Sequence, residues 1–262
     1  MALVLVFVVG LVAISAERLW PARPLRRVPN WWTRVLALNL AQVGVVLLVG
    51  AWLDPWLARS GVGLGLRTWS PWAQGGLTYL VSCALYYGWH RARHESPLLW
   101  RWLHQTHHAP ERLEVAMAFY KHPLEAGSNA LISSALAFGL MGCSPEGAAI
   151  YTLLAGTSEL FYHLNLRTPH WVGYLIQRPE MHRIHHQRGH HANNYADLAP
   201  IDMLFGTWHN PRPEEGEVVC GLGPELEDRF EDQLLARDLE DVEDRPPAVF
   251  LPAWIGAEGP RG

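Results

Sequence analysis

Histidine is the residue whose spacing carries the most chemical information in this chain. Three clusters, of the forms HxxxH, HxxHH and HxxHH, contain eight histidines: His90 and His94; His104, His107 and His108; and His182, His185 and His186. On an α-helix, residues three or four positions apart lie on one face, so each cluster can direct its imidazoles at one place. Eight imidazoles make a poor hydrophobic core, because every neutral ring has a donor and an acceptor that need partners. They are good ligands for first-row transition metals.

A further histidine, His163, follows an apolar run and brings the set to nine. A catalytic zinc ion needs only three protein ligands, so nine histidines are enough for two metal ions with open coordination positions. Imidazole binds zinc, copper, iron and nickel alike, and the residue types alone leave the metal open. The sequence has neither the HExxH motif of zinc proteases nor the Glu-x-x-His set of soluble di-iron bundles.

Several classes of protein therefore stay open on the residues alone. An intramembrane zinc-dependent hydrolase would use histidines of this kind, and a b-type haem protein needs only paired axial histidines. A metal transporter or storage protein would place its polar ligands at the middle of the membrane. The clusters here flank the apolar runs instead, which disfavours the transporter.

The composition excludes some other classes. The net charge is −4 with histidine neutral, so no basic surface indicates a nucleic-acid partner. The cysteines, Cys83, Cys143 and Cys220, are far apart in the sequence and form no CxxC motif. Their spacing argues against a disulfide framework and against a thiolate zinc site.

The apolar runs predict an all-α, integral membrane helical bundle with about four or five membrane segments. These runs cover residues 2–16, 35–53, 73–89, 126–142 and 147–164. Many of the 13 tryptophans lie near the ends of the runs, as in the aromatic belts of membrane proteins. No basic segment precedes the first run, which favours a membrane helix over a cleaved signal peptide.

The charges between the runs predict the orientation of this multi-pass protein. Arg23, Arg26 and Arg27 follow the first run, and the positive-inside rule places their loop in the cytoplasm. Successive crossings then bring His163 and all three clusters to the cytoplasmic side. All three clusters then lie on one face of the membrane, as a shared site requires.

The chain divides near residue 210. Residues 1–210 are predicted to form the membrane domain, with the histidine core at about 75–210. Residues 211–262 read as a cytosolic acidic tail. Within it, Leu226, Phe230, Leu234, Leu239 and Val242 fall near helical spacing and predict one amphipathic helix over 225–243.

The order of the histidine motifs resembles the fatty acid hydroxylase/sterol desaturase superfamily of membrane oxygenases. The resemblance covers roughly residues 75–210 and includes further matching segments: 121–125 (KHPLE), 161–165 (FYHLN), Asn194-Tyr195 and 201–207 (IDMLFGT). It implies a helical membrane bundle with a cytosolic helical cap, which holds two iron ions at a histidine-ligated di-iron centre. Zinc is a possible substitute, because imidazole binds both metals. The implied activity is that of a non-haem monooxygenase-type oxidoreductase, which uses O2 to hydroxylate or desaturate a C–H bond of a fatty acyl, sterol-like or other isoprenoid lipid.

The resemblance also implies roles for individual residues. The ligands would be His90, His94, His104, His107, His108, His163, His182, His185 and His186. Additional ligands, or residues that hold the ligands, would come from His122, His190, Asn165, Asn194 and Asp202; the last fits a bond to an imidazole and a turn cap equally well. The chain departs from the family in having Ala196 after Asn-Tyr and Arg167 where some members supply another histidine.

Electrons for such a reaction must come from outside the chain. The sequence has neither a glycine-rich dinucleotide fingerprint after a strand nor a haem-attachment CxxCH motif. We therefore expect a separate electron donor, either a ferredoxin or a cytochrome with its reductase. The lipid substrate is expected to enter from the bilayer.

Overall fold

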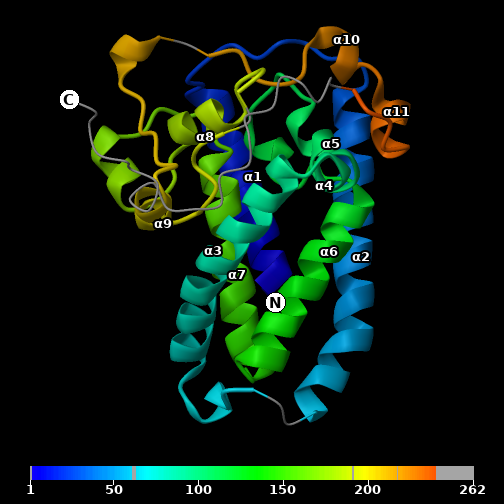
Figure 1. The fold of residues 1–262 in the computed structure, drawn as a ribbon, viewed down its shortest axis with the longest axis vertical. Coiled ribbons are helices and arrows are strands. Elements are labelled where there is room, and N and C mark those ends of the chain that lie inside the picture. Colours follow the sequence, from blue (N-terminus) through cyan, green and yellow to red (C-terminus); the bar gives the residue numbers. More distant parts are fainter. Residues whose placement is uncertain (1, 61–62, 191, 217, 240–262) are drawn as a thin grey trace, which may run out of the picture.

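The computed structural model describes residues 2–60, 63–190, 192–216 and 218–239 (Figure 1). Helices joined by turns and irregular loops make up this part of the chain, and its one β-type contact is an isolated bridge between Gln187 and Cys220. The prediction of an all-helical protein is confirmed.

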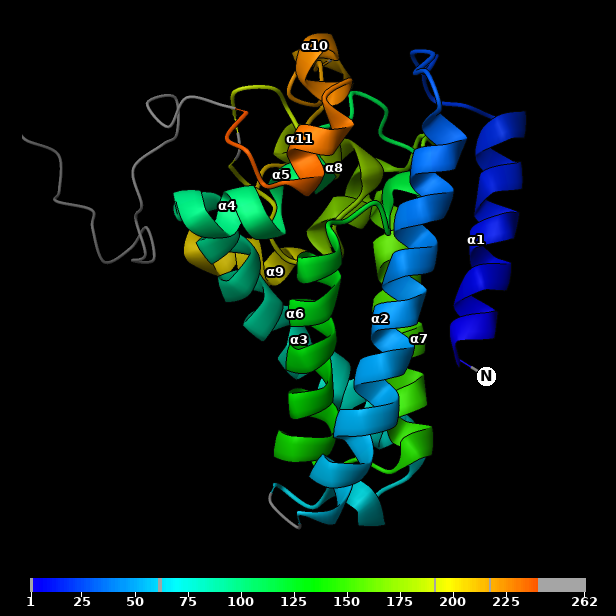
Figure 2. The ribbon, with the colours of Figure 1, turned by 90° about the vertical axis from the view of Figure 1, so that its right-hand side faces the viewer.

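The long helices lie side by side along the long axis of the molecule (Figures 1 and 2). They are α1 (Ala2–Leu19), α2 (Trp31–Arg59), α3 (Pro71–Glu95), α6 (Pro123–Ser134), which continues into a π-helical segment (Ala135–Leu140), and α7 (Pro145–Tyr162). Helix α3 packs on α7, α2 packs on α6, and α1 packs on α7. At the α3–α7 contact, Gly75 and Gly147 lie so close to the opposite helix that a Cβ atom on either would clash. Small residues at such positions let helices approach closely.

Ser-Pro sequences define where two of these helices begin. Ser70 accepts a hydrogen bond from the backbone N–H of Ala73, and Pro71 occupies the first turn of α3. Ser144 does the same for Gly147 at the start of α7, where Pro145 follows. A serine N-cap followed by proline satisfies one free N–H group and removes another.

Two helices of the described residues, α1 and α2, are long and apolar enough to cross a membrane, judged by length and composition. Their most apolar stretches have mean hydropathies of 2.2 and 2.0, and only 11% of each stretch is buried. Large apolar side chains such as Val4, Phe7 and Leu48 are exposed on their surfaces. The core helix of a soluble protein would bury such a face instead.

The short helices form a cap at one end of the bundle (Figures 1 and 2). They are α4 (Pro97–Leu103), α5 (Gln105–His108), α8 (Pro179–His185), α9 (Ala199–Phe205), α10 (Pro224–Glu227) and α11 (Phe230–Leu234). Short 3-10 helices occur at Val115–Met117, His170–Tyr174 and Pro213–Glu215. Another, Leu66–Thr68, lies in the connection between α2 and α3. Helices α3 and α7 both end in the cap, so they deliver the histidines at their C-terminal ends to α5 and α8.

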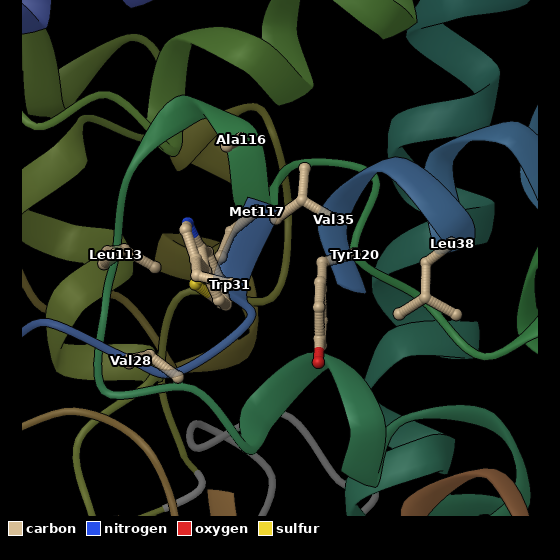
Figure 3. Packing of buried hydrophobic residues seen from close by; sticks show 8 residues of the cluster. All are labelled: Val28, Trp31, Val35, Leu38, Leu113, Ala116, Met117 and Tyr120. Carbon is tan, nitrogen blue, oxygen red and sulfur yellow. The ribbon is translucent and has the colours of Figure 1, made fainter. Parts of the chain in front are cut away.

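An apolar cluster attaches the first turns of α2 to the cap (Figure 3). Trp31, at the start of α2, stacks on Tyr120 with ring centroids 5.3 Å apart. Leu113 and Met117 are fully buried against the same cluster. The cluster fixes residues 113–120, the segment that leads into the histidine site.

The C-terminal segment differs from the single helix expected over 225–243. In the structure α10 ends at Glu227 and α11 covers only Phe230–Leu234, while residues 240–262, Val242 included, lie outside the described part. The fully buried Gln233 side chain donates to the carbonyl oxygens of Leu226 and Glu227, at 3.1 Å each. This interaction satisfies carbonyls at the end of α10 and folds α11 back, so apolar spacing alone did not predict the break.

Candidate metal centre

The structure gathers all nine predicted ligands into two adjacent groups. The first histidine group contains His90, His94, His104, His108 and His185. The second histidine group contains His107, His163, His182 and His186. Within each group, one ring nitrogen per residue lies within 4.8 Å of the corresponding nitrogens of the others.

The two HxxHH clusters each contribute to both groups. In each cluster the i and i+4 histidines share a group, and the i+3 histidine joins the other group. The rings of His108 and His186, one from each group, stack with centroids 4.0 Å apart. The two groups therefore form one continuous centre with two places for an ion.

The spacing of the nitrogens fits a bound metal. Two imidazole nitrogens about 2.1 Å from one ion lie about 3.0 Å apart at a right angle and about 3.4 Å apart at the tetrahedral angle. The observed Nε2–Nε2 distances are 2.9 Å for His90–His104, 3.0 Å for His163–His182, 3.0 Å for His182–His186 and 3.3 Å for His107–His163. Nitrogens at these distances are spaced as neighbouring ligands of a single ion would be.

The tautomer of several histidines is fixed by the hydrogen bond that Nδ1, the other ring nitrogen, makes. The Nδ1 atoms contact carbonyl oxygens as follows: His90 with Tyr195 (2.8 Å), His163 with Glu159 (2.8 Å), His185 with Asn193 (2.8 Å) and His107 with Tyr120 (3.3 Å). A carbonyl oxygen can only accept, so Nδ1 must carry the proton in each pair. Nε2 is then left with its lone pair, which is the state that binds a metal.

His104 is oriented by a carboxylate that the sequence did not single out. Its Nδ1 lies 3.0 Å from Oε1 of Glu125, which is fully buried and also accepts a bond from Arg93. The sequence did contain a signal for Glu125, because this residue ends the segment 121–125, one of the segments that resemble those of the family. A carboxylate bonded to a ligand imidazole raises the basicity of that ligand.

Aromatic side chains exclude water from the centre. Trp100, which is only 1% exposed, contacts the rings of His94 and His108 at centroid distances of 5.2 and 5.1 Å. Tyr195 packs edge-on against His90 and His185, at 5.5 and 5.4 Å. An ion placed here would be surrounded by protein rather than solvent.

Burial keeps these histidines neutral. Desolvation holds the pKa values of His104, His107, His108 and His182 well below the usual range, and nearby positive charge adds to the effect. For His163, burial lowers the pKa to about 3. Metal binding requires neutral imidazole, so the folded chain presents its ligands in the competent form.

Acid is expected to destabilise the metal-free protein. In the unfolded chain His163 takes up a proton below a pH of about 6.5, whereas in the folded chain it does so only near its pKa of about 3. Stability is therefore lost as pH falls through this window, by about 2 kcal/mol at pH 5 from His163 alone. We expect Tm of the metal-free protein in detergent to drop by about 4–8 °C more in wild type than in His163→Gln between pH 7 and pH 5. Equal drops in the two proteins would contradict the assignment.

The two additional histidines named from the sequence lie outside both groups. His122 caps α6: its Nδ1 accepts from the backbone N–H of Leu124, and its Nε2 donates to the Leu234 carbonyl. The Nε2 of His190 lies 2.8 Å from Oδ1 of Asn193. Both side chains serve the structure around the site rather than joining the nitrogen clusters.

The two additional asparagines hold backbone and side chains around the groups. The Oδ1 atom of Asn165 accepts from Arg183, and its Nδ2 donates to the Arg23 carbonyl. Asn194 has φ of 52° and donates to the carbonyls of Met181 and His209. Asparagine tolerates this left-handed conformation better than most residues.

Asp202 acts as a turn cap and does not bond an imidazole directly. Its carboxylate accepts from the backbone N–H groups of Tyr195 and Ala196, at 2.8 and 2.9 Å, and from the Thr207 hydroxyl. Burial raises the pKa of Asp202 to about 6. Because the Tyr195 carbonyl orients His90, Asp202 supports a ligand through one backbone segment.

An apolar cavity of about 490 Å³ runs from the histidines into the bundle. Its upper wall includes members of both groups: His90 and His104 from the first, and His107 and His182 from the second. The remaining wall comes largely from α1, α2, α3, α7, and α6 with its π-helical continuation, and it includes apolar residues such as Val43 and Phe138. The volume falls within the roughly 300–1,000 Å³ of small-molecule sites.

Comparison with known proteins gives a consistent family. Residues 76–207 match the family described as fatty acid hydroxylase. Alkylglycerol monooxygenase of Xenopus tropicalis is 30% identical over 161 residues, which cover 58% of this chain and 33% of that protein. The human alkylglycerol monooxygenase is 29% identical over 52% of this chain and 30% of its own length. Sphingolipid C4-hydroxylase sur2 of Schizosaccharomyces pombe is 25% identical over 49% of this chain and 45% of its own length.

The matched region is a part of each relative. The chain spans about a third of the length of the alkylglycerol monooxygenases and less than half of the yeast hydroxylase. No solved structure matches it. The family match extends over half of the chain and contains all nine histidines of the two groups, and on this ground the chain belongs to the fatty acid hydroxylase family.

Proposed function

We propose that this chain is a membrane-bound, O2-dependent lipid hydroxylase with a histidine-ligated di-iron centre. The observation that carries the proposal is the shared cavity, since both histidine groups open onto one apolar space inside a helical bundle. The relatives are named as a monooxygenase of alkylglycerols and a hydroxylase of sphingolipids, which favours hydroxylation over desaturation.

The proposed ligands are the five histidines of the first group and the four of the second. Two iron ions held there would activate O2. The two electrons that this requires would come from an external donor. Neutral imidazoles also bind zinc, so zinc is expected to occupy the same positions as a substitute. An intramembrane zinc hydrolase is the less favoured alternative, because the named relatives are oxygenases and hydroxylases.

The membrane helices are proposed to include α3, α6 and α7 in addition to α1 and α2. The Arg23–Arg27 segment and both histidine groups lie at the same end of the bundle, the end that carries the cap (Figure 1). The positive-inside rule puts this end in the cytoplasm. A lipid could then reach the cavity from the bilayer with its chain between the helices.

The side chains around the cavity position the lipid and keep water away. Tyr162 lines the cavity and packs on His163 and His182, with ring centroids 4.9 and 4.6 Å apart. Trp100 packs on His94 and Tyr195 packs on His185, so both rings also shield the centre from water. Holding one carbon of the lipid next to the histidines selects the C–H bond that reacts, and the dry walls protect the reacting centre from side reactions.

The test is turnover in a reconstituted system. The iron-loaded protein, a ferredoxin or cytochrome donor with its reductase and NAD(P)H, and isotopically labelled O2 would be combined in lipid nanodiscs. Ether lipids, sphingoid bases and acyl lipids would be supplied in turn. We expect one labelled oxygen atom in a lipid product, and only when the electron donor is present. Lipid cleavage without O2 would instead support the hydrolase, and an unlabelled product would refute the oxygenase.

A further inference from the structure

The cavity has two ends that differ in chemistry. At the histidine end, Glu125 on α6 contacts His104. Further along α6, Ser134 lines the cavity and contacts the Asp54 carboxylate of α2. Nine residues of helix separate Glu125 from Ser134, which is about 14 Å along the axis. Asp54, five residues before the end of α2, therefore lies at the end of the cavity remote from the histidines, which we call the distal end.

Two oxygen atoms on the cavity face of α2 lack partners. Oδ1 of Asp54 and Oε1 of Gln42 are buried, and neither has a hydrogen-bond partner among the described residues. Both side chains line the cavity. Gln42 lies nearer the histidine end of the cavity. Val45, one turn later on α2, lies beside Gly127, which is two residues after Glu125 on α6. The two acceptors are twelve residues apart, or about 18 Å along the helix.

Unpaired acceptors in an apolar membrane cavity are costly. A buried polar atom without a hydrogen bond loses its interactions with water and gains nothing in return. Both atoms are acceptors, so the group that would satisfy them must be a hydrogen-bond donor.

We propose that the lipid substrate carries a hydroxyl or amino group at each end, and that Asp54 binds the end remote from the reacting carbon. Gln42 binds the donor nearer the histidines, and the apolar wall between them holds an extended chain. The proposal rests on the proposed function only in taking this cavity as the lipid site. It selects a two-ended polar lipid over a lipid with a plain hydrocarbon tail.

Binding to metal-free protein tests this without turnover. The probes are a saturated long-chain alcohol and the diol of the same length with a hydroxyl at each end, each titrated into nanodiscs with Kd read from competition with a fluorescent fatty alcohol. Wild type is expected to bind the diol roughly 3- to 10-fold more tightly than the alcohol, which is the contribution of one hydrogen bond. In Asp54→Leu the ratio should fall to about one, whereas Asp54→Asn, which keeps a carbonyl acceptor, should retain part of it.

The matched control is Glu146→Gln, which changes a carboxylate near the same end of the bundle. Glu146 lies in the first turn of α7 and does not line the cavity, so this variant should keep the wild-type ratio. A wild-type protein that binds both probes equally would overturn the proposal, even if Asp54→Leu did not fold. So would an Asp54→Leu variant with an undiminished preference for the diol. Because no metal is loaded, failure here leaves the oxygenase proposal to its own turnover assay.

Discussion

The His107→Ala variant is expected to lose about half of the bound metal and all lipid oxidation. The second histidine group has four members, and the Nε2 of His107 lies 3.3 Å from that of His163. Losing the partner of a ligand typically costs 10- to 100-fold in metal affinity, so losing a ligand itself should cost at least about 100-fold. The His185→Ala variant should have the corresponding effect on the first group. Metal content of the purified proteins and lipid product would be measured side by side.

The control for both variants is His209→Ala. His209 belongs to neither group, and its partly exposed ring lies beside Glu215. This variant should keep wild-type metal content and turnover. Thermal melting must show that the two ligand variants remain folded. Full activity in either purified ligand variant would reject the assignment of ligands.

The sequence could predict which histidines would meet, because the reasons are local. The HxxxH and HxxHH spacings place imidazoles on one side of a helical segment. The order of the apolar runs brings the clusters to one end of the bundle, and the structure has them there. His107 and His185 each join a different histidine group from the other members of their own cluster. This division depends on how α5 faces α8. That angle is set by tertiary packing, which no spacing rule contains.

The supporting residues were harder to predict for the same reason. Glu125 is remote in sequence from His104, and only the packing of α6 against the cap joins them. His122 was a candidate ligand by residue type, yet the proline after it favours a helix start, and the structure uses it as a cap. From the sequence, Asp202 fitted a bond to an imidazole and a turn cap equally well. In the structure its carboxylate accepts from backbone N–H groups, as a turn cap does. The number of membrane crossings stays a prediction.

Blocking the cavity should abolish lipid oxidation without removing metal. Ala130 lies on α6 between Glu125 and the distal end, and its side chain lines the cavity. In Ala130→Trp the indole ring would fill the space that the lipid chain needs, and overpacking in so confined a place is not relieved by small shifts. We expect kcat/KM for the lipid to fall by at least about 100-fold, or about 2.7 kcal/mol in the barrier. Metal content should match wild type, because no ligand or ligand partner is touched.

The matched control is the neighbouring residue on the same helix. Leu131 is exposed on the outer face of α6 and does not line the cavity, so Leu131→Trp adds an indole of the same size that points away from the site. Wild-type turnover in this variant and its loss in Ala130→Trp would locate the lipid chain between the helices. If Ala130→Trp oxidised lipid at the wild-type rate, the substrate would have to reach the histidines by another route. That result would show that the cavity is not the lipid site. Together with the ligand variants, this pair separates two ways of losing activity: the metal is lost in His107→Ala, and access to it is lost in Ala130→Trp.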